Sequence, residues 1–280
     1  MRFPAPARHR LASAGLLGLM ALTLTSAAAA QRHRAAMDGR MSCSDRDWDN
    51  ARTERFCNIS EQTMAAPAGA LHVDGRMNGG ISVVGTDRKD VLVRARIEAH
   101  ARTRERAEEL ARAVEVHTSG DRVYAEGPDT RNREWWSVEF EVEVPARSDL
   151  DLVAHNGGIA VAEVTGTLRM ETMNGGIHLE AVGGDVTAET TNGGLTVDLD
   201  GDRWEGKGLD ATTTNGGVRV LVPASYSAHL ETGTVNGGVD IDFPVTVQGR
   251  IGRRITTDLG RGGATVRVVT TNGGVSIRKG

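Results

Sequence analysis

The side chains that could carry out catalysis or bind a metal ion are scattered along this 280-residue sequence. No two of the histidines after residue 30 have the spacing of paired metal ligands; they are His33, His72, His100, His117, His155, His178 and His229. The Gly-x-Ser-x-Gly turn of serine hydrolases and the Gly-x4-Gly-Lys-Ser/Thr phosphate loop are both absent from the sequence. We therefore predict no catalytic residues, no metal site and no cofactor.

Aspartates give the nearest approach to a calcium site. Asp198, Asp200 and Asp202 alternate along one stretch, but Arg203 stands where the EF-hand loop needs glycine. The Gly-Gly-x-Gly-x-Asp unit of calcium-binding β-rolls is also absent. We interpret these aspartates as part of a solvated face.

Three tryptophans suit carbohydrate binding, because an indole ring stacks well on a sugar ring. They are Trp135, Trp136 and Trp204. The alternative, which we favour, is that these rings pack within the protein. Some parallel β-helices cleave acidic polysaccharides with charged residues on one face, but the charged positions here are mixed in sign and form no pattern of that kind: Arg169, Glu171, His178, Glu180, Glu189 and Arg219.

Both cysteines, Cys43 and Cys57, lie in a polar N-terminal segment, residues 31–70, which we expect to be irregular. In an exported chain, two cysteines most simply form one disulfide, and closing so short a loop would contribute roughly 3 kcal/mol. Metal binding by two thiols without a nearby histidine is the weaker alternative.

Residues 1–30 have the features of a secretory signal peptide. Arg2, Arg8 and Arg10 precede an apolar run, Leu16 to Leu24, which is followed by four alanines. The run is too short to span a membrane, and we expect no transmembrane span after its removal. Without these three arginines, the chain has 30 basic and 37 acidic residues, a net charge of −7. This balance gives no electrostatic reason to expect nucleic-acid binding.

The elements that must position any functional side chain come from an internal repeat. Asn-Gly-Gly occurs seven times, each followed by an apolar-x-apolar strand, with asparagine at positions 78, 156, 174, 192, 215, 236 and 272. Two gaps between successive asparagines are 18 residues, and the last gap, 36 residues, is twice that length. Each unit holds two short strands with alternating apolar residues, so the fold is predicted to be an all-β parallel β-solenoid with coils of about 18 residues.

The asparagines Asn78, Asn156, Asn174, Asn192, Asn215, Asn236 and Asn272 are predicted to form a structural ladder. Counting back by two and four residues from each asparagine reaches inward-facing positions, which predicts that the asparagines also point inward. Stacked amides would then bond to one another, and the glycine pair would supply positive φ for a tight bend. The competing interpretation is a series of Asn-Gly β-hairpins.

Residues 71–280 are predicted to form the solenoid domain, with an insertion at about residues 98–145. Residues 103–114 show a helical apolar stripe, and Thr103 is placed to cap that helix. Strands are expected around 114–117, 123–125 and 136–144. We interpret this insertion as a small α+β N-terminal cap, because an open solenoid end exposes strand edges and apolar interior.

Several of these features occur together in one known family. They are the N-terminal cysteine pair, the start Val73-Asp74-Gly75 with Asn78-Gly79-Gly80, the later Asn-Gly-Gly coils, the stretch 201–206 and the stretch 230–238. Over residues 40–278 the sequence resembles bacterial exported proteins of a β-strand-repeat class called "putative adhesin", a family of unknown function. The resemblance implies a parallel β-solenoid in the cell envelope or exterior and supplies no catalytic residues.

The leading functional hypothesis is an exported, non-catalytic module, periplasmic or at the cell surface, that binds an envelope or surface glycan or protein in the manner of an adhesin. A second hypothesis is a periplasmic partner-binding scaffold or a component of an envelope-stress system. A polysaccharide-active β-helix enzyme ranks third.

Overall fold

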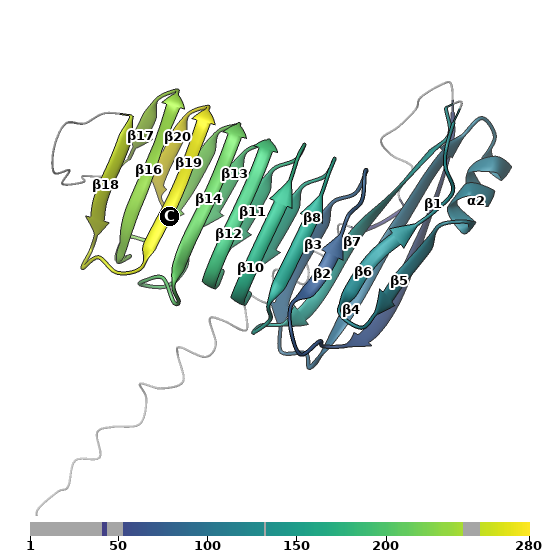
Figure 1. Cartoon of the computed structure of the whole chain (residues 1–280), viewed down its shortest axis with the longest axis horizontal. Helices are drawn as coiled ribbons and strands as arrows, with labels where there is room; N and C mark the ends of the chain where they lie inside the picture. The colour runs from purple at the N-terminus through teal and green to yellow at the C-terminus, as the bar shows by residue number, and fades with distance from the viewer. Residues whose placement is uncertain (1–40, 44–52, 132, 243–252) are drawn as a thin grey trace, which may run out of the picture.

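The computed structural model describes residues 41–43, 53–131, 133–242 and 253–280. The predicted signal peptide, residues 1–30, lies outside the described residues. The described strands form two ten-stranded sheets, called sheet A and sheet B. In each sheet the strands are stacked one after another along the long axis of the molecule (Figure 1). Buried side chains from both sheets form one main hydrophobic cluster, so the core lies between the sheets.

Each sheet places strands in a spatial order that differs from their order in the chain. From one edge to the other, sheet A contains β1 (Glu54–Ala65), β4 (Asp90–Ala101), β7 (Trp135–Pro145), β3 (Ile81–Thr86), β9 (Ile159–Ala162), β11 (Ile177–Glu180), β13 (Leu195–Asp198), β15 (Val218–Val222), β20 (Val275–Lys279) and β17 (Val239–Ile241). Sheet B contains β18 (Arg254–Leu259), β16 (Ala228–Asn236), β19 (Thr265–Asn272), β14 (Gly208–Asn215), β12 (Gly183–Asn192), β10 (Thr165–Thr172), β8 (Leu150–Ala154), β2 (Leu71–Asp74), β6 (Arg122–Glu126) and β5 (Glu115–Ser119).

Each Asn-Gly-Gly turn carries the chain from a strand of sheet B to a strand of sheet A. Equivalent strands of neighbouring coils pair in parallel and in register with the repeat: Ile177 of β11 lies between Ile159 of β9 and Leu195 of β13. The predicted parallel β-solenoid is therefore confirmed. The hairpin interpretation is wrong, because strands joined by these turns lie in different sheets.

Two coils lie out of sequence order in the stack. The C-terminal coil, β19–β20, does not end the stack. It is inserted between β14–β15 and β16–β17, because β19 pairs in parallel with both β14 and β16. At the other end, β6–β7 pairs in parallel with β2–β3 and so forms a coil outside it, although β2–β3 comes first in the sequence.

The predicted alternation is visible in every regular coil. In β11, Ile177 and Leu179 are buried, His178 is exposed and Glu180 is partly exposed. Threonines two residues before the asparagine are buried as well. Their hydroxyls donate to the carbonyl oxygen of the first glycine in the adjacent coil: Thr172 to Gly157, Thr190 to Gly175, Thr213 to Gly193, Thr270 to Gly216 and Thr234 to Gly273, at 2.7–2.8 Å.

The asparagine ladder, formed by the seven repeat asparagines, runs the length of the stack. Each Nδ2 donates to the Oδ1 of the adjacent coil: Asn156 to Asn78, Asn174 to Asn156, Asn192 to Asn174, Asn215 to Asn192, Asn272 to Asn215 and Asn236 to Asn272, at 2.7–3.1 Å. The expectation that these side chains point inward is wrong, since all seven residues are exposed. The alternation breaks at the turn: Thr190 is buried, whereas Thr191 and Asn192 are both exposed.

Close packing of coils, rather than positive φ, explains the first glycine of each pair. A Cβ on Gly216 would lie 1.9 Å from the carbonyl oxygen of Gly193, and the first glycines of the other coils would meet a neighbouring backbone oxygen at 1.9–2.1 Å. Among the seven pairs, only Gly273 has positive φ, at 157°, close to extended backbone. The prediction that the glycine pair supplies positive φ is therefore wrong. The first glycine is needed because the adjacent coil leaves no room for a Cβ.

The N-terminal cap contains the predicted helix, α2 (Arg104–Arg112). The Thr103 hydroxyl accepts a hydrogen bond from the backbone N–H of Arg106 at 3.2 Å, as an N-cap does. Ala107, Leu110 and Ala111 are buried, and the helix packs on β1 and β4. Antiparallel strands extend sheet A at the cap end, where β1 pairs with β4 and β4 with β7. They extend sheet B at both ends, where β5 pairs with β6 and β18 with β16.

The segment 31–70 is not irregular throughout. Residues 54–65 form the 12-residue strand β1, which pairs antiparallel with the whole of β4. Cys57 of β1 is joined to Cys43 by a disulfide. The polar composition concealed this strand, because β1 is an edge strand with much of its surface exposed.

The two glycines of one pair provide a matched test of the steric role. Gly216→Ala should lower the free energy of unfolding by about 1–3 kcal/mol or more, because the new methyl group meets backbone that is fixed by the adjacent coil. In Gly217→Ala the nearest atom to the new Cβ would lie 3.6 Å away, so stability should stay within about 0.5 kcal/mol of the wild type. Urea unfolding followed by circular dichroism compares the two, and equal losses would contradict this role.

The exposed asparagines and the buried threonines should differ in their contributions to stability. Asn192→Ala should cost about 0.5–1.5 kcal/mol, because water can replace the lost ladder partners. Thr190→Val should cost about 1–3 kcal/mol, because the buried hydroxyl donor to Gly175 is lost. Urea midpoints of the two variants measure the difference, and a larger loss for the asparagine variant would show that the ladder dominates.

Candidate functional site

A shallow groove lies beside the Asn-Gly-Gly turns where the repeat coils meet the cap. We call it the groove head; its volume is about 590 Å³, and it is lined by Asn78, Gly79, Gly80, Arg96, Trp135, Ser137, Glu139, Asn156, Gly157 and Gly158. The glycines bring no side chains, so backbone forms the floor. Aromatic, amide and charged groups surround that floor.

The same surface continues along the stack. We call the second glycines of the seven pairs the glycine track; in spatial order they are Gly80, Gly158, Gly176, Gly194, Gly217, Gly274 and Gly238. From Gly158 onward these glycines are exposed. A second groove, of about 630 Å³, lies over the far coils and is lined by the track from Gly194 to Gly238, together with Arg219 and Asp240. Grooves at both ends of the stack therefore share one repeating floor.

Trp135 is the aromatic group of the groove head. It begins β7, opposite His100 of β4, and 38% of its surface is exposed. One face of the indole stacks on the His100 ring, with centroids 3.9 Å apart and planes 10° from parallel. Because His100 is itself buried, Trp135 is held as a rigid platform.

A partly buried polar network supports that platform. The Nε2 atom of His100 lies 2.9 Å from Glu98 Oε1, and Arg55 Nη2 of β1 donates to Glu98 Oε2 at 2.9 Å. Burial acts to raise the pKa of the Glu98 carboxyl, but hydrogen bonds and charge from Arg55 and His100 outweigh it and hold the pKa below its ordinary value. Glu98 is therefore ionised at neutral pH and fixes His100 beneath Trp135.

Polar groups complete the groove head. Arg96 of β4 forms an ion pair with Glu139, its partner across the strand pair in β7. Neither residue was identified from the sequence. Alternation along β7 places Ser137 and Glu139 on the same face as Trp135. The strand pattern of the sequence could therefore have predicted that these three side chains lie together. The contribution of Arg96 depended on the pairing of β4 with β7.

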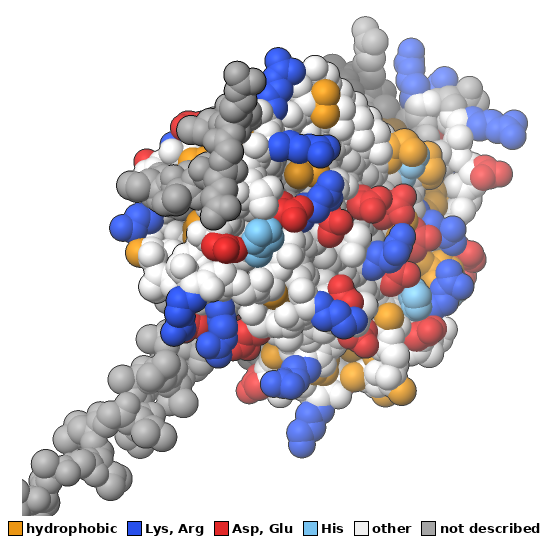
Figure 2. All heavy atoms as spheres, turned by 60° about the vertical axis from the view of Figure 1, so that its left-hand side comes forward, with side chains coloured by type: hydrophobic (Ala, Val, Ile, Leu, Met, Phe, Trp, Pro, Cys, Tyr) orange, Lys and Arg blue, Asp and Glu red, His pale blue; other side chains and the backbone are white. Residues whose placement is uncertain are grey.

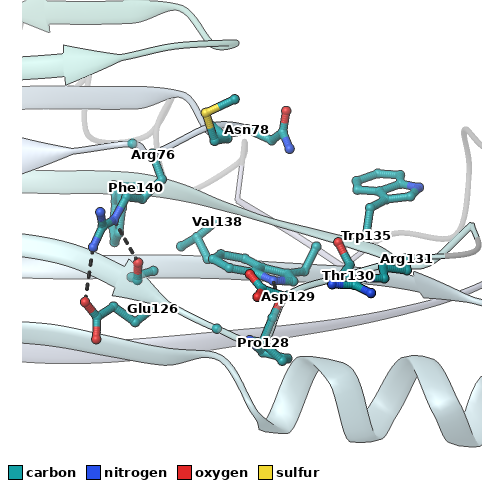
Figure 3. A pocket seen from close by; sticks show the side chains of 15 residues that line it. Arg76, Asn78, Glu126, Pro128, Asp129, Thr130, Arg131, Trp135, Val138 and Phe140 are labelled. Atoms are coloured by element: carbon teal, nitrogen blue, oxygen red, sulfur yellow. Dashed lines mark hydrogen bonds and ion pairs between the residues drawn. The ribbon is translucent and has the colours of Figure 1, made fainter.

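A second cavity, of about 760 Å³, adjoins the groove head and shares Asn78 and Trp135 with it (Figure 3). It lies between the turn at residues 75–78 and the loop at residues 127–131 that follows β6. Arg76 extends across one side, donating from Nε to the carbonyl of Ala125 and from Nη2 to Glu126, both at 3.2 Å (Figure 3). In the outermost coil, β6–β7, this loop stands where the repeat coils have an Asn-Gly-Gly turn, and the cavity lies beside it.

The other two tryptophans have structural contacts. Trp204 is only 5% exposed, and its indole N–H donates to the carbonyl of Gly184 at 3.0 Å, so it packs over the coil. Trp136 is half-buried and donates to the carbonyl of Pro128 at 3.0 Å. Of the three tryptophans considered for stacking, Trp135 has the exposed face, whereas Trp204 is excluded by burial.

The visible surface carries interspersed acidic and basic side chains (Figure 2). Exposed pairs such as Arg278 with Asp240 and Lys207 with Asp185 contribute to this mixture. Within the described part of the chain, no helix is both long and apolar enough to cross a membrane.

Comparison with known families gives one match. Residues 146–278 match the family model described as Toastrack DUF4097. This range spans the coils from β8–β9 to β19–β20 and leaves out most of the cap. No curated protein sequence matches the chain significantly.

Solved structures resemble the chain at low identity. A "putative cell adhesion protein" from Clostridium sporogenes is 12% identical with a TM-score of 0.37, over 80% of this chain and 100% of that one. A "putative adhesin" from Bacteroides fragilis is 10% identical with a TM-score of 0.34, over 79% and 97%. A "putative lipid binding protein" from Parabacteroides distasonis is 8% identical with a TM-score of 0.30, over 80% and 97%.

The network beneath Trp135 gives a pH-dependent prediction. Since the folded pKa of Glu98 is lowered, its contribution is present above the unfolded pKa, about 4.3, and is lost as pH falls through the folded value. Glu98→Gln should therefore lower the melting temperature at pH 7, and the difference from wild type should narrow below about pH 4. The matched control is Glu108→Gln in an exposed helical pair with Arg112, which should have little effect. A difference that is constant with pH would contradict the ionised state of Glu98.

Proposed function

We propose that this chain, whose residues 146–278 belong to the Toastrack DUF4097 family, is an exported, non-catalytic, adhesin-like module that binds a linear glycan of the cell envelope or exterior. The glycan lies in the groove head and continues along the glycine track. The observation that carries this proposal is the exposed face of Trp135 beside the exposed amides of Asn78 and Asn156.

The chemistry of the groove head suits a sugar. The C–H face of a pyranose ring packs against an indole, and Trp135 needs no reorganisation because His100 already holds its other face. Sugar hydroxyls are both donors and acceptors, as are the amide groups of the ladder. Arg96 and Glu139 add charged partners at the edge of the groove.

The repeating surface suits a linear polymer. Parallel coils present the same backbone and amide groups at intervals of about 4.8 Å, the usual distance between paired strands. Ligand approach also offers a reason for the second glycine at Gly217, Gly238 and Gly274, where a Cβ would meet nothing closer than 3.6 Å. A side chain at these positions would be tolerated by the fold but would obstruct the track.

Export is supported by the disulfide between Cys43 and Cys57, since such bonds persist in oxidising compartments. It agrees with the signal peptide predicted at residues 1–30. The proposed location is therefore the periplasm or the cell surface.

A second candidate function is a periplasmic partner-binding scaffold or envelope-stress component. Three exposed apolar side chains favour it: Met77, Val153 and Met173, which are 59%, 43% and 46% exposed and line one shallow pocket on the sheet B side of the turns. Apolar groups gathered on an exposed surface are typical of protein-binding sites. None of these three side chains lines the groove head itself, so substitutions at the patch and at Trp135 test different surfaces.

The glycan proposal is tested with the chain 31–280, disulfide intact, applied to peptidoglycan, soluble polysaccharides and fractionated envelope material. Trp135→Ala should weaken retention on one glycan about tenfold, corresponding to about 1.4 kcal/mol for one lost stacking contact. Gly217→Leu should weaken retention on a long polymer without changing the melting temperature. The control is Ile59→Ala, which truncates a side chain with the same 38% exposure on β1.

Each outcome assigns the function. Retention that Trp135→Ala reduces and Ile59→Ala does not reduce supports the proposed glycan site. Retention on envelope protein alone, sensitive to Met77→Ser and Met173→Ser, would replace it with the partner-binding scaffold. New reducing ends released from any polysaccharide would overturn the non-catalytic assignment.

A further inference from the structure

Three side chains with metal-binding atoms meet on the outer face of sheet A. His178 and Glu180 lie two residues apart on β11 and therefore share one face of the strand. Asp198 lies on β13 directly beside Glu180 in the strand register. One ligand atom from each residue lies within 4.8 Å of the other two. In the sequence, His178 is isolated and Asp198 belongs to a row interpreted as solvated, and only strand pairing brings them together.

Two of the three side chains are carboxylates on adjacent strands. Glu180 and Asp198 lie directly opposite each other in the strand register, and neighbouring negative charges of this kind attract a cation. His178 Nε2 lies 3.2 Å from Asp198 Oδ2. The other oxygen, Asp198 Oδ1, is shielded from solvent and has no hydrogen-bond partner among the described residues. A shielded carboxylate oxygen without a donor is costly, and a bound cation would satisfy it.

We propose that His178, Glu180 and Asp198 bind a divalent transition-metal ion, for which Zn²⁺ is the reference case. One imidazole nitrogen and two carboxylates form a donor set that zinc accepts, whereas calcium and magnesium prefer oxygen alone. Tetrahedral zinc ligands at about 2.0–2.2 Å from the metal lie about 3.3–3.6 Å from one another. The His178–Asp198 separation of 3.2 Å is close to that distance.

The surroundings leave space for the ion and for a water molecule as fourth ligand. On the adjacent strand β9, the residues paired with His178 and Glu180 are the short side chains Ala160 and Ala162. The side chains of His178 and Asp198 are 48% and 27% exposed, so they can rotate slightly to close around the ion. None of the three ligands lines the groove head, and this site therefore does not depend on the glycan proposal.

The experiment is a calorimetric Zn²⁺ titration of the tag-free chain 31–280 after chelator treatment and dialysis. The wild-type chain should bind one equivalent of Zn²⁺ at this site, and excess Ca²⁺ or Mg²⁺ should not displace the bound Zn²⁺. His178→Gln and Asp198→Asn should each weaken that binding at least tenfold. His229→Gln is the matched control, because His229 also pairs with carboxylates, Asp258 at 2.7 Å and Glu231 at 3.7 Å. This variant should bind Zn²⁺ as wild type does.

A thermal measurement separates a metal site from an ordinary surface ion pair. Without metal, Asp198→Asn should melt at the same or a higher temperature than wild type, because it removes the charge of a carboxylate whose Oδ1 is shielded and has no donor among the described residues. With Zn²⁺, the melting temperature should rise for wild type and His229→Gln but not for His178→Gln or Asp198→Asn. No Zn²⁺ binding by wild type, or equal binding by wild type and His178→Gln, would overturn the proposal.

Discussion

The close approach of successive coils at the first glycine of each Asn-Gly-Gly turn is the constraint on which this structure depends. At Gly175 and Gly216 the adjacent coil brings a backbone carbonyl oxygen to about 2 Å from where a Cβ would lie. The same contact lets a buried threonine of one coil donate to the first-glycine carbonyl of its neighbour, as Thr213 does to Gly193. Sterics and hydrogen bonding thus fix the register of the stack at one point per coil.

Fixed register turns a sequence repeat into rows on the surface. One row is the asparagine ladder, whose amides bond to one another while remaining in contact with solvent. Beside it runs the glycine track, which stays open because its residues have no side chains. On sheet A the same register places Asp198 beside Glu180, close to His178. The groove and the cluster of His178, Glu180 and Asp198 on sheet A therefore both follow from the fixed register of the coils.

The ends of the stack follow another rule, because a solenoid end exposes unpaired strands. In the cap, β1 and β4 continue sheet A with antiparallel pairing and α2 packs against them. That arrangement also places Trp135 on His100 at the boundary between cap and coils. The most distinctive surface group of the molecule thus lies where the repeat begins.

The sequence by itself determined the repeat, the two-strand coil, the parallel stacking and the capped helix, because each depends on local alternation, turn chemistry or helix periodicity. It did not determine that the repeat asparagines face solvent, because the turn changes the phase of the alternation just before Asn192. It also missed β1, the position of β19–β20 inside the stack, and the groupings of Trp135 with His100 and of His178 with Asp198. Only the tertiary structure decided these, because they depend on which distant strands pair and in what register, and local periodicity carries no information about that choice.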